Sequence, residues 1–313
     1  MEFKKREFYG LLIQGDLHGA VDYLAPFPEQ QELLERYQAV FNRGEVLRRS
    51  DNMLVNQVDA VFQSYYRAVF WQKAPDREAR SALAADLARL AGLTLASAAP
   101  LDERLDCAEQ RVAELVEAEG FHYLGGETSG WFGPYIWKTN ETTVYQVELP
   151  RDQIEVPVTM MKEFVSRSWL DFLSFGQVGT GGWTKEDGLY CVWKAYKENL
   201  NTPSFQITFL KHEGQHKLDM TQYGVTDSTL LEYRAKLVEL IYYPDLTTLQ
   251  GFLAEANGNN SKNAHAMAAY QIVTELTRRL FGVAEAPPLA WEGKEDAVRN
   301  AARTLYEESY QSR

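Results

Sequence analysis

The chain of 313 residues has few cysteines and no long apolar run. Its two cysteines, Cys107 and Cys191, exclude a disulfide framework and a cysteine-rich zinc site. No stretch approaches the roughly 18 uninterrupted apolar residues of a membrane span. The N-terminal MEFKKREFYG is basic, but the apolar segment of a signal peptide does not follow it. We therefore expect a cytoplasmic protein.

The chain also has few positive charges, since it contains 32 Lys and Arg residues against 44 Asp and Glu residues, for a net charge of −12. This balance argues against nucleic acid and against an anionic membrane as a partner. The hydrophobic content of 45% and aromatic content of 12% are typical of a folded protein with a sizeable core. The length allows two ordinary domains.

Apolar residues recur at helical spacing through the first 120 residues. The pattern predicts a helix that ends at Gly44 and further helices over 51–72, 76–91 and 102–119. We interpret the aromatic residues of these helices as packing residues.

The pattern changes near residue 121, where aromatic and β-branched residues begin to alternate. Asn140-Glu141 predicts the turn of a hairpin. The later segments predict a helix over 158–174, a glycine-rich bend over 179–183, a strand over 188–196 and helices from 202 onward. We therefore expect an α+β fold with a helical N-terminal region over 1–120. Residues 121–313 form the second domain, a small mixed or antiparallel sheet with a helical C-terminal part.

The segment LLIQGDLHGAV at 11–21 resembles the first metal motif of the calcineurin-like phosphoesterases. The resemblance implies that Asp16 and His18 would ligate one metal of a pair held about 3.5–4 Å apart. That family supplies the other ligands from a second Gly-Asp segment, a Gly-Asn-His segment and later histidines, and the sequence has none of these. An N-terminal turn is the favoured interpretation.

Residues 211–220 read KHEGQHKLDM and contain the pattern H-E-x-x-H. Thr202-Pro203 provides a good start for a helix through this segment. His212 and His216 lie about 6 Å apart along such a helix and face the same way, so both can reach one zinc ion. Glu213 lies about 100° round the helix, where it can bond to a metal-bound water without being a ligand. The alternative is a solvated polar face flanked by lysines.

A third ligand is available on the next predicted helix. The first helix should stop near Tyr223-Gly224, and TDST at 226–229 supplies capping residues for LLEYRAKLVELIYY at 230–243. If the two helices pack antiparallel, Glu232 lies level with His216, and the small side chain of Ala235 permits close packing. Two histidines and a glutamate with one open position make up a catalytic zinc site.

H-E-x-x-H followed by E-x-x-A on the next helix resembles the gluzincin metallopeptidases, the thermolysin-like group. The resemblance covers about 202–243 and implies that 121–313 is a zincin-like catalytic domain with one zinc ion per chain. His212, His216 and Glu232 would hold the ion, and Glu213 would act as general base on a zinc-bound water that attacks a peptide bond. It also implies that an edge strand binds the substrate, a peptide or small protein, and GLYCVWKAY is the candidate strand.

The resemblance leaves two supporting roles open. Gluzincins use a downstream histidine or tyrosine to stabilise the oxyanion, and His265, close to the start of a helix capped by Ser261, is the first candidate. Tyr270 is the second, and Tyr242 is a further option. Ligand histidines also need an orienting partner.

The departures from the family pattern concern that orienting partner and the neighbours of the ligands. Lys236 stands where some relatives have an aspartate that orients a histidine, so Asp219 and Glu239 are the remaining options. Lys217 is charged where the pattern is usually uncharged, and the step from His216 to Glu232 is somewhat short.

The sequence favours a zinc-dependent peptidase over two alternative functions. One is a non-catalytic zinc-binding protein with a binding or regulatory role, against which the intact Glu213 argues. The other is a hydrolase of small amides or esters. Cleavage specificity, oligomeric state and the role of residues 1–120 stay open.

Overall fold

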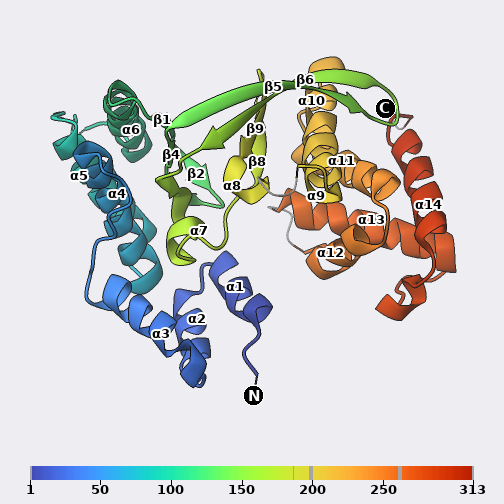
Figure 1. Ribbon diagram of the computed structural model, residues 1–313, viewed down its shortest axis with the longest axis horizontal. Coiled ribbons are helices and arrows are strands. Elements are labelled where there is room, and N and C mark those ends of the chain that lie inside the picture. The colour runs from blue at the N-terminus through green and yellow to red at the C-terminus, as the bar shows by residue number, and fades with distance from the viewer. Residues whose placement is uncertain (1, 97, 186, 197–199, 260–262, 312–313) are drawn as a thin grey trace. The chain divides into compact units, whose positions relative to one another are not determined.

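The computed structural model describes residues 2–311 apart from 97, 186, 197–199 and 260–262 (Figure 1). Helices predominate and the strands form small sheets, so the predicted α+β class is confirmed. The chain divides into two compact units. The first joins Met1–Thr139 with Met161–Thr180, and the second joins Asn140–Met160 with Gly181–Arg313. Each unit has its own hydrophobic core.

This division differs from the single boundary that we expected near residue 120. The last N-terminal helix does end there and strands follow, but the first unit continues through later segments. The reason is packing, because Ile136, Trp169 and Phe172 are buried in the same core as the N-terminal helices. The helical region therefore completes its core with residues far along the chain.

The first unit consists mainly of helices at the predicted positions. Asn52 begins the helix predicted over 51–72, since its side chain accepts a hydrogen bond from the backbone N–H of Val55 at 3.0 Å. The helices are α1 (Lys5–Ile13), α2 (Leu17–Leu24), α3 (Gln31–Tyr37), α4 (Met53–Tyr66), α5 (Asp76–Leu90), α6 (Leu101–Ala118) and α7 (Ser168–Leu173), with a 3-10 turn over Pro28–Gln30 and π-helical turns over Gln38–Asn42 and Arg67–Trp71. The strands are β1 (His122–Leu124), β4 (Tyr135–Trp137) and β7 (Ser166–Arg167) in one sheet, and β2 (Glu127–Thr128) with β3 (Trp131–Phe132) in a second.

The Gly-Asp-x-His-Gly segment forms a turn between α1 and α2. Asp16 caps α2 by accepting a hydrogen bond from the backbone N–H of Gly19 at 3.0 Å. The Nε2 atom of His18 lies 2.7 Å from the carbonyl oxygen of Trp71, and the two rings stack. Both side chains that a phosphoesterase would use for metal therefore have local structural roles.

Two predictions for the middle of the chain are wrong. Asn140-Glu141 lies inside strand β5 (Thr139–Glu148), and the turn comes later, where the N–H of Leu149 donates to the carbonyl of Asp152 at 2.8 Å. Pro150 explains this position, because proline favours the second position of a turn and Asn140-Glu141 lacks a glycine.

The helix predicted over 158–174 is also wrong. Strand β6 (Gln153–Lys162) occupies its first part, and only α7 is helical. Val156, Val158 and Met160 are buried at every second position, which is the period of a strand. The apolar run Met160-Met161 obscured that period in the sequence.

The second unit combines a four-stranded sheet with helices. The sheet has the order β5-β6-β9-β8, and β8 (Gly182–Lys185) pairs antiparallel with β9 (Gly188–Val192). The predicted strand over 188–196 is therefore right for its first part only, since α8 follows it. The helices are α8 (Trp193–Tyr196), α9 (Pro203–Phe205), α10 (His212–Gln222), α11 (Ser228–Tyr242), α12 (Thr247–Glu255), α13 (Ala264–Phe281) and α14 (Glu295–Glu308), with a π-helical turn over Gln206–Lys211 and a 3-10 turn over Pro288–Trp291.

Helix α11 is the central helix of this unit and packs against α10, α13 and α14 (Figure 1). Every residue over 232–241 is buried, charged ones included. Buried charges need partners, and Lys236 has one, because its Nζ atom donates to Glu255 of α12 at 2.8 Å. The helix therefore carries polar groups into the interior only where neighbouring helices bind them.

A buried polar network joins α10, α11 and α14. Arg234 donates to Asp219 at 2.7 Å and, through its other terminal nitrogen, to the carbonyl of Ser309 at 2.7 Å. Asp219 also accepts from Gln215 and from the Tyr310 hydroxyl, each at 2.8 Å. Because these groups satisfy one another, the network fixes how the three helices sit along their axes.

The two longest described helices, α6 and α13, each have 18 residues and carry several charged side chains. Across the described residues, no helix combines the length and the apolar character needed to cross a membrane. The cytoplasmic location stays a prediction.

Candidate metal centre

The helix that carries H-E-x-x-H follows a π-helical turn. The chain enters α9 after Thr202, winds as a π-helix over Gln206–Lys211 and begins α10 at His212. The helix predicted to run from Thr202-Pro203 through H-E-x-x-H is therefore not one continuous α-helix. Such π-helical turns are frequent at functional sites.

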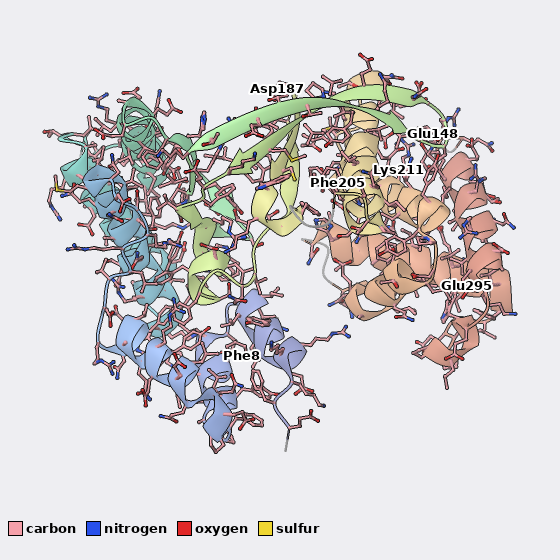
Figure 2. The ribbon with its side chains drawn as sticks, viewed as in Figure 1. Phe8, Glu148, Asp187, Phe205, Lys211 and Glu295 are labelled. Atoms are coloured by element: carbon pink, nitrogen blue, oxygen red, sulfur yellow. The ribbon has the colours of Figure 1, made fainter. Side chains whose placement is uncertain are left out.

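Lys211 is not part of a solvated helix face. Its ammonium group donates to the carbonyl of Glu148 at the end of β5 (Figure 2) and lies 3.9 Å from the ring centroid of Tyr242. Burial lowers the pKa of Lys211. The lysine therefore ties the start of α10 to the sheet and to α11, which removes one of the two charges that supported the polar-face alternative.

His212, His216 and Glu232 come together as the sequence predicts. The Nε2 atoms of the two histidines lie 3.1 Å apart. Glu232 places one oxygen 3.5 Å from His212 Nε2 and the other 3.7 Å from His216 Nε2. One possible ligand atom from each of these three side chains lies within 4.8 Å of the other two, close enough together to bind one metal ion. Among the described residues, no other group of three His, Cys, Asp or Glu side chains meets this criterion.

The short connection between α10 and α11 brings Glu232 to this position. Helix α10 ends at Gln222, and Gly224 has a positive φ of 61° that reverses the chain. Asp227 then caps α11 by accepting a hydrogen bond from the N–H of Leu230 at 2.7 Å. Ala235 is fully buried, and its small side chain permits close packing between the helices.

The donor set fits zinc. Ligand atoms of a tetrahedral zinc ion, at bond lengths of about 2.0–2.1 Å, lie about 3.3–3.4 Å apart, close to the separations of 3.1–3.7 Å in this cluster. The Oε2 atom of Glu232 is also buried, and it lies 2.8 Å from His265 Nδ1 and 3.5 Å from His212 Nε2. A buried carboxylate is unfavourable unless hydrogen-bond donors of this kind or a cation bind it.

Glu239 orients His212. Its Oε1 atom lies 2.6 Å from His212 Nδ1, and both side chains are buried. A carboxylate on Nδ1 fixes the ring so that Nε2 faces the other ligand atoms, as is usual for metal-bound histidines. Of the two partners that the sequence offered, Asp219 is engaged by Arg234 instead.

The side chains of the cluster have very different pKa values. Burial opposes a charge on His212, but the carboxylates of Glu232 and Glu239 raise its pKa to about 10. Burial and the neighbouring charge of His212 lower the pKa of His216 to about 3. Burial also works against the charged form of Glu232, yet His212 and His265 hold the pKa of this carboxyl well below its ordinary value.

Zinc binding is expected to release a proton and to strengthen as the pH rises. Because the pKa of His212 is about 10, its imidazole is protonated near neutral pH, whereas zinc requires the neutral form. Fewer protons compete at higher pH, so Kd should fall about tenfold per unit between about pH 6 and 8. Calorimetry in buffers of different ionisation enthalpy counts the released protons, and a Kd that does not change with pH would contradict this.

Replacing Glu239 by alanine is expected to weaken zinc binding by about 10–100-fold, since outer carboxylates of this kind contribute that much. Glu239→Gln keeps an acceptor for His212 Nδ1 and should lose less. Competition with a chromophoric chelator measures both affinities. Glu292→Ala, at an exposed position, is the control, and an unchanged Kd in Glu239→Ala would show that the contact does not support the site.

Glu213 is held by a residue that the sequence did not single out. The hydroxyl of Thr184, on β8, donates to Glu213 Oε2 at 2.5 Å. The sequence did contain a signal for a hairpin here, because an Asp-Gly pair such as Asp187-Gly188 favours one, but the glycines of 179–183 predict a bend instead of a strand.

The candidate edge strand must be corrected for the same reason. GLYCVWKAY supplies β9, which lies between β6 and β8 in the sheet. Strands β8 and β5 are the two edges of this sheet, and α10 packs against β8. Thr184, which contacts Glu213, therefore lies on an edge strand, beside which a substrate backbone could bind as an additional strand.

Of the candidate oxyanion residues, His265 lies at the cluster. Its Nδ1 atom is 2.8 Å from Glu232 Oε2, and its side chain is 57% exposed in the first turn of α13. Asn263 caps this helix by accepting from the N–H of Ala266 at 3.0 Å. The predicted cap, Ser261, lies outside the described residues.

The two tyrosine candidates have other surroundings. Tyr270 is 46% exposed, and its ring lies over Gly258, where an added Cβ would come within 2.7 Å of it. Tyr242 lies beneath the Lys211 ammonium group. A catalytic role for either tyrosine stays a prediction, and His265 is the candidate with a contact to a predicted ligand.

No family model, curated protein or solved structure matches the chain. The resemblance to the gluzincins therefore rests on the two motifs and on the local geometry that the chain gives them.

Proposed function

We propose that the protein is a zinc-dependent peptidase of gluzincin type. The observation that carries the proposal is the convergence of His212, His216 and Glu232, with Glu213 next in sequence to the first ligand. Two histidines and one carboxylate leave a coordination position open, which is the composition of catalytic rather than structural zinc sites.

Each residue at the site has one task in this proposal. When bound, zinc would supply a water of lowered pKa and polarise the scissile carbonyl. Glu213 accepts a proton from the attacking water and delivers it to the leaving amine. Glu239 keeps His212 in the orientation that binds metal, and His265 would donate a hydrogen bond to the developing oxyanion.

Strand β8 provides the place for an extended substrate. It is one of the two edge strands of the described sheet and packs against α10. Extended peptides bind edge strands through main-chain hydrogen bonds, which give affinity without a fixed sequence. This surface favours a peptide over a small amide or ester as the substrate.

The proposal is tested by zinc content and by cleavage of a peptide library. Protein purified without added zinc is expected to hold about one ion per chain. Removal of zinc by a chelator should stop cleavage, and added zinc should restore it. Glu232→Ala should lose the metal, because it removes one of only three protein ligands, while Glu292→Ala at an exposed position should keep it.

The other outcomes separate the alternatives. A zinc-free wild type would refute the metal site. Bound zinc with no cleavage of peptides, amides or esters would favour a non-catalytic zinc-binding protein. Cleavage of small amides or esters without peptide cleavage would favour the third hypothesis.

A further inference from the structure

We propose that Thr184 is the positioning residue for the general base, holding the Glu213 carboxylate in its working orientation. This inference rests on the proposed function, since it assigns Glu213 the proton transfer. Its basis is the hydrogen bond of 2.5 Å from the Thr184 hydroxyl to Glu213 Oε2. A hydrogen bond from a hydroxyl to a carboxylate is one of the stronger hydrogen bonds in proteins.

Thr184 is a rigid support for this bond. It is paired with Leu189 in the antiparallel ladder of β8 and β9, so its backbone is fixed. Its β-branched side chain has few accessible rotamers. Glutamate has three side-chain torsions, and a fixed donor at one oxygen removes much of that freedom before substrate arrives.

Two glycines bring the strands close enough to the helical segment for this contact. A Cβ at Gly182, two residues before Thr184 and on the same face of β8, would come within 2.5 Å of the Phe209 ring. A Cβ at Gly214, next to Glu213, would come within 3.2 Å of Val147 on β5. Gly182 therefore leaves room for the Phe209 ring of the π-helical turn against β8, and Gly214 leaves room for Val147 of β5 against α10.

The two carboxylate oxygens of Glu213 have different roles in this proposal. Thr184 engages Oε2, so proton transfer is assigned to Oε1. Loss of the hydroxyl leaves the zinc ligands untouched, because neither Thr184 nor Glu213 is one of them. The expected defect therefore lies in the rate of the chemical step and not in metal binding.

The test compares Thr184→Val, which keeps the shape but lacks the donor, with Thr184→Ser, which keeps the donor. Zinc content should stay near one ion per chain in both. Thr184→Val should lower kcat about 10–100-fold, since small misplacement of a catalytic group has effects of this size, with KM nearly unchanged. Thr184→Ser should restore most of kcat. Thr143→Val, at an exposed threonine on β5, is the matched control.

A second readout does not depend on turnover. Acetohydroxamate binds zinc and places its hydroxyl proton beside the neighbouring carboxylate, so its affinity for the zinc-loaded protein reports the orientation of Glu213. Calorimetry should show about tenfold weaker binding to Thr184→Val, the loss expected for one hydrogen bond to a charged group. Thr184→Ser should bind as the wild type does, and Glu213→Gln should bind at least as weakly as Thr184→Val.

The outcomes separate this proposal from the proposed function. Equal kcat and equal hydroxamate affinity in wild type and Thr184→Val would overturn the positioning role. A lower melting temperature with unchanged hydroxamate affinity would also overturn it, since Thr184 would then only fasten β8 to α10. If the wild type cleaves no peptide but the hydroxamate series follows the expected order, the positioning role stands and the peptidase proposal fails.

Discussion

Replacing Glu213 by glutamine is expected to leave about one zinc ion per chain and to slow peptide hydrolysis by about 10²–10⁴-fold, the usual contribution of a general base. Glutamine has the same shape and can still accept the Thr184 hydrogen bond through its amide oxygen. It cannot take a proton at neutral pH. The metal ligands are unchanged, so the loss should appear in kcat and not in zinc content.

The measurement pairs zinc analysis with kcat on the best substrate from the peptide library. Glu292→Gln removes a carboxylate at an exposed position of the same unit and should keep full activity. Full activity in Glu213→Gln would remove Glu213 from the mechanism. Loss of zinc in the same variant would mean that the carboxylate supports the metal site and not only the proton transfer.

Replacing Arg234 by alanine is expected to lower the free energy of unfolding by about 3–5 kcal/mol, the typical effect of removing one partner from a buried ion pair. Arg234 is fully buried and donates to Asp219 and Ser309, and its guanidinium lies 3.6 Å from the ring centroid of Tyr310. Alanine leaves the Asp219 carboxylate buried without its cation. Urea unfolding of the zinc-free protein measures the change without a contribution from metal binding.

Arg279 offers a matched control on the same unit. It pairs with Glu308, and both side chains are partly exposed, at 38% and 46%. Exposed pairs of this kind contribute about 0–1 kcal/mol, so Arg279→Ala should be nearly neutral. If Arg234→Ala destabilised the protein no more than Arg279→Ala does, the buried network would not be what holds α10, α11 and α14 together.

The clustering of the three predicted metal ligands could be predicted from the sequence because it depends on local geometry. Two histidines four residues apart on a helix share a face whatever the rest of the chain does. Glu232 needed only the capped turn at Asp227 and an antiparallel return of the next helix. The helices of the first unit followed from apolar periodicity in the same way.

The contacts that the sequence did not predict depend on the pairing of distant segments. Thr184 reaches Glu213 only because β8 pairs with β9 at the edge of the sheet and α10 packs beside it. The spacing of Thr184 and Glu213 in the sequence does not predict that they are in contact. The helix predicted over 158–174 overlaps the end of strand β6, because the apolar pair Met160-Met161 hides the alternation of that strand.

The hydrophobic core of the first unit cannot be complete until residues far beyond its N-terminal helices have been synthesised. The first unit takes Met161–Thr180 into its core, although the Asn140–Met160 segment of the second unit comes before them. Helices α1 to α6 therefore leave the ribosome without Trp169 and Phe172, which are buried among them in the finished protein. Until these residues are made, the core of the first unit lacks two of its aromatic side chains.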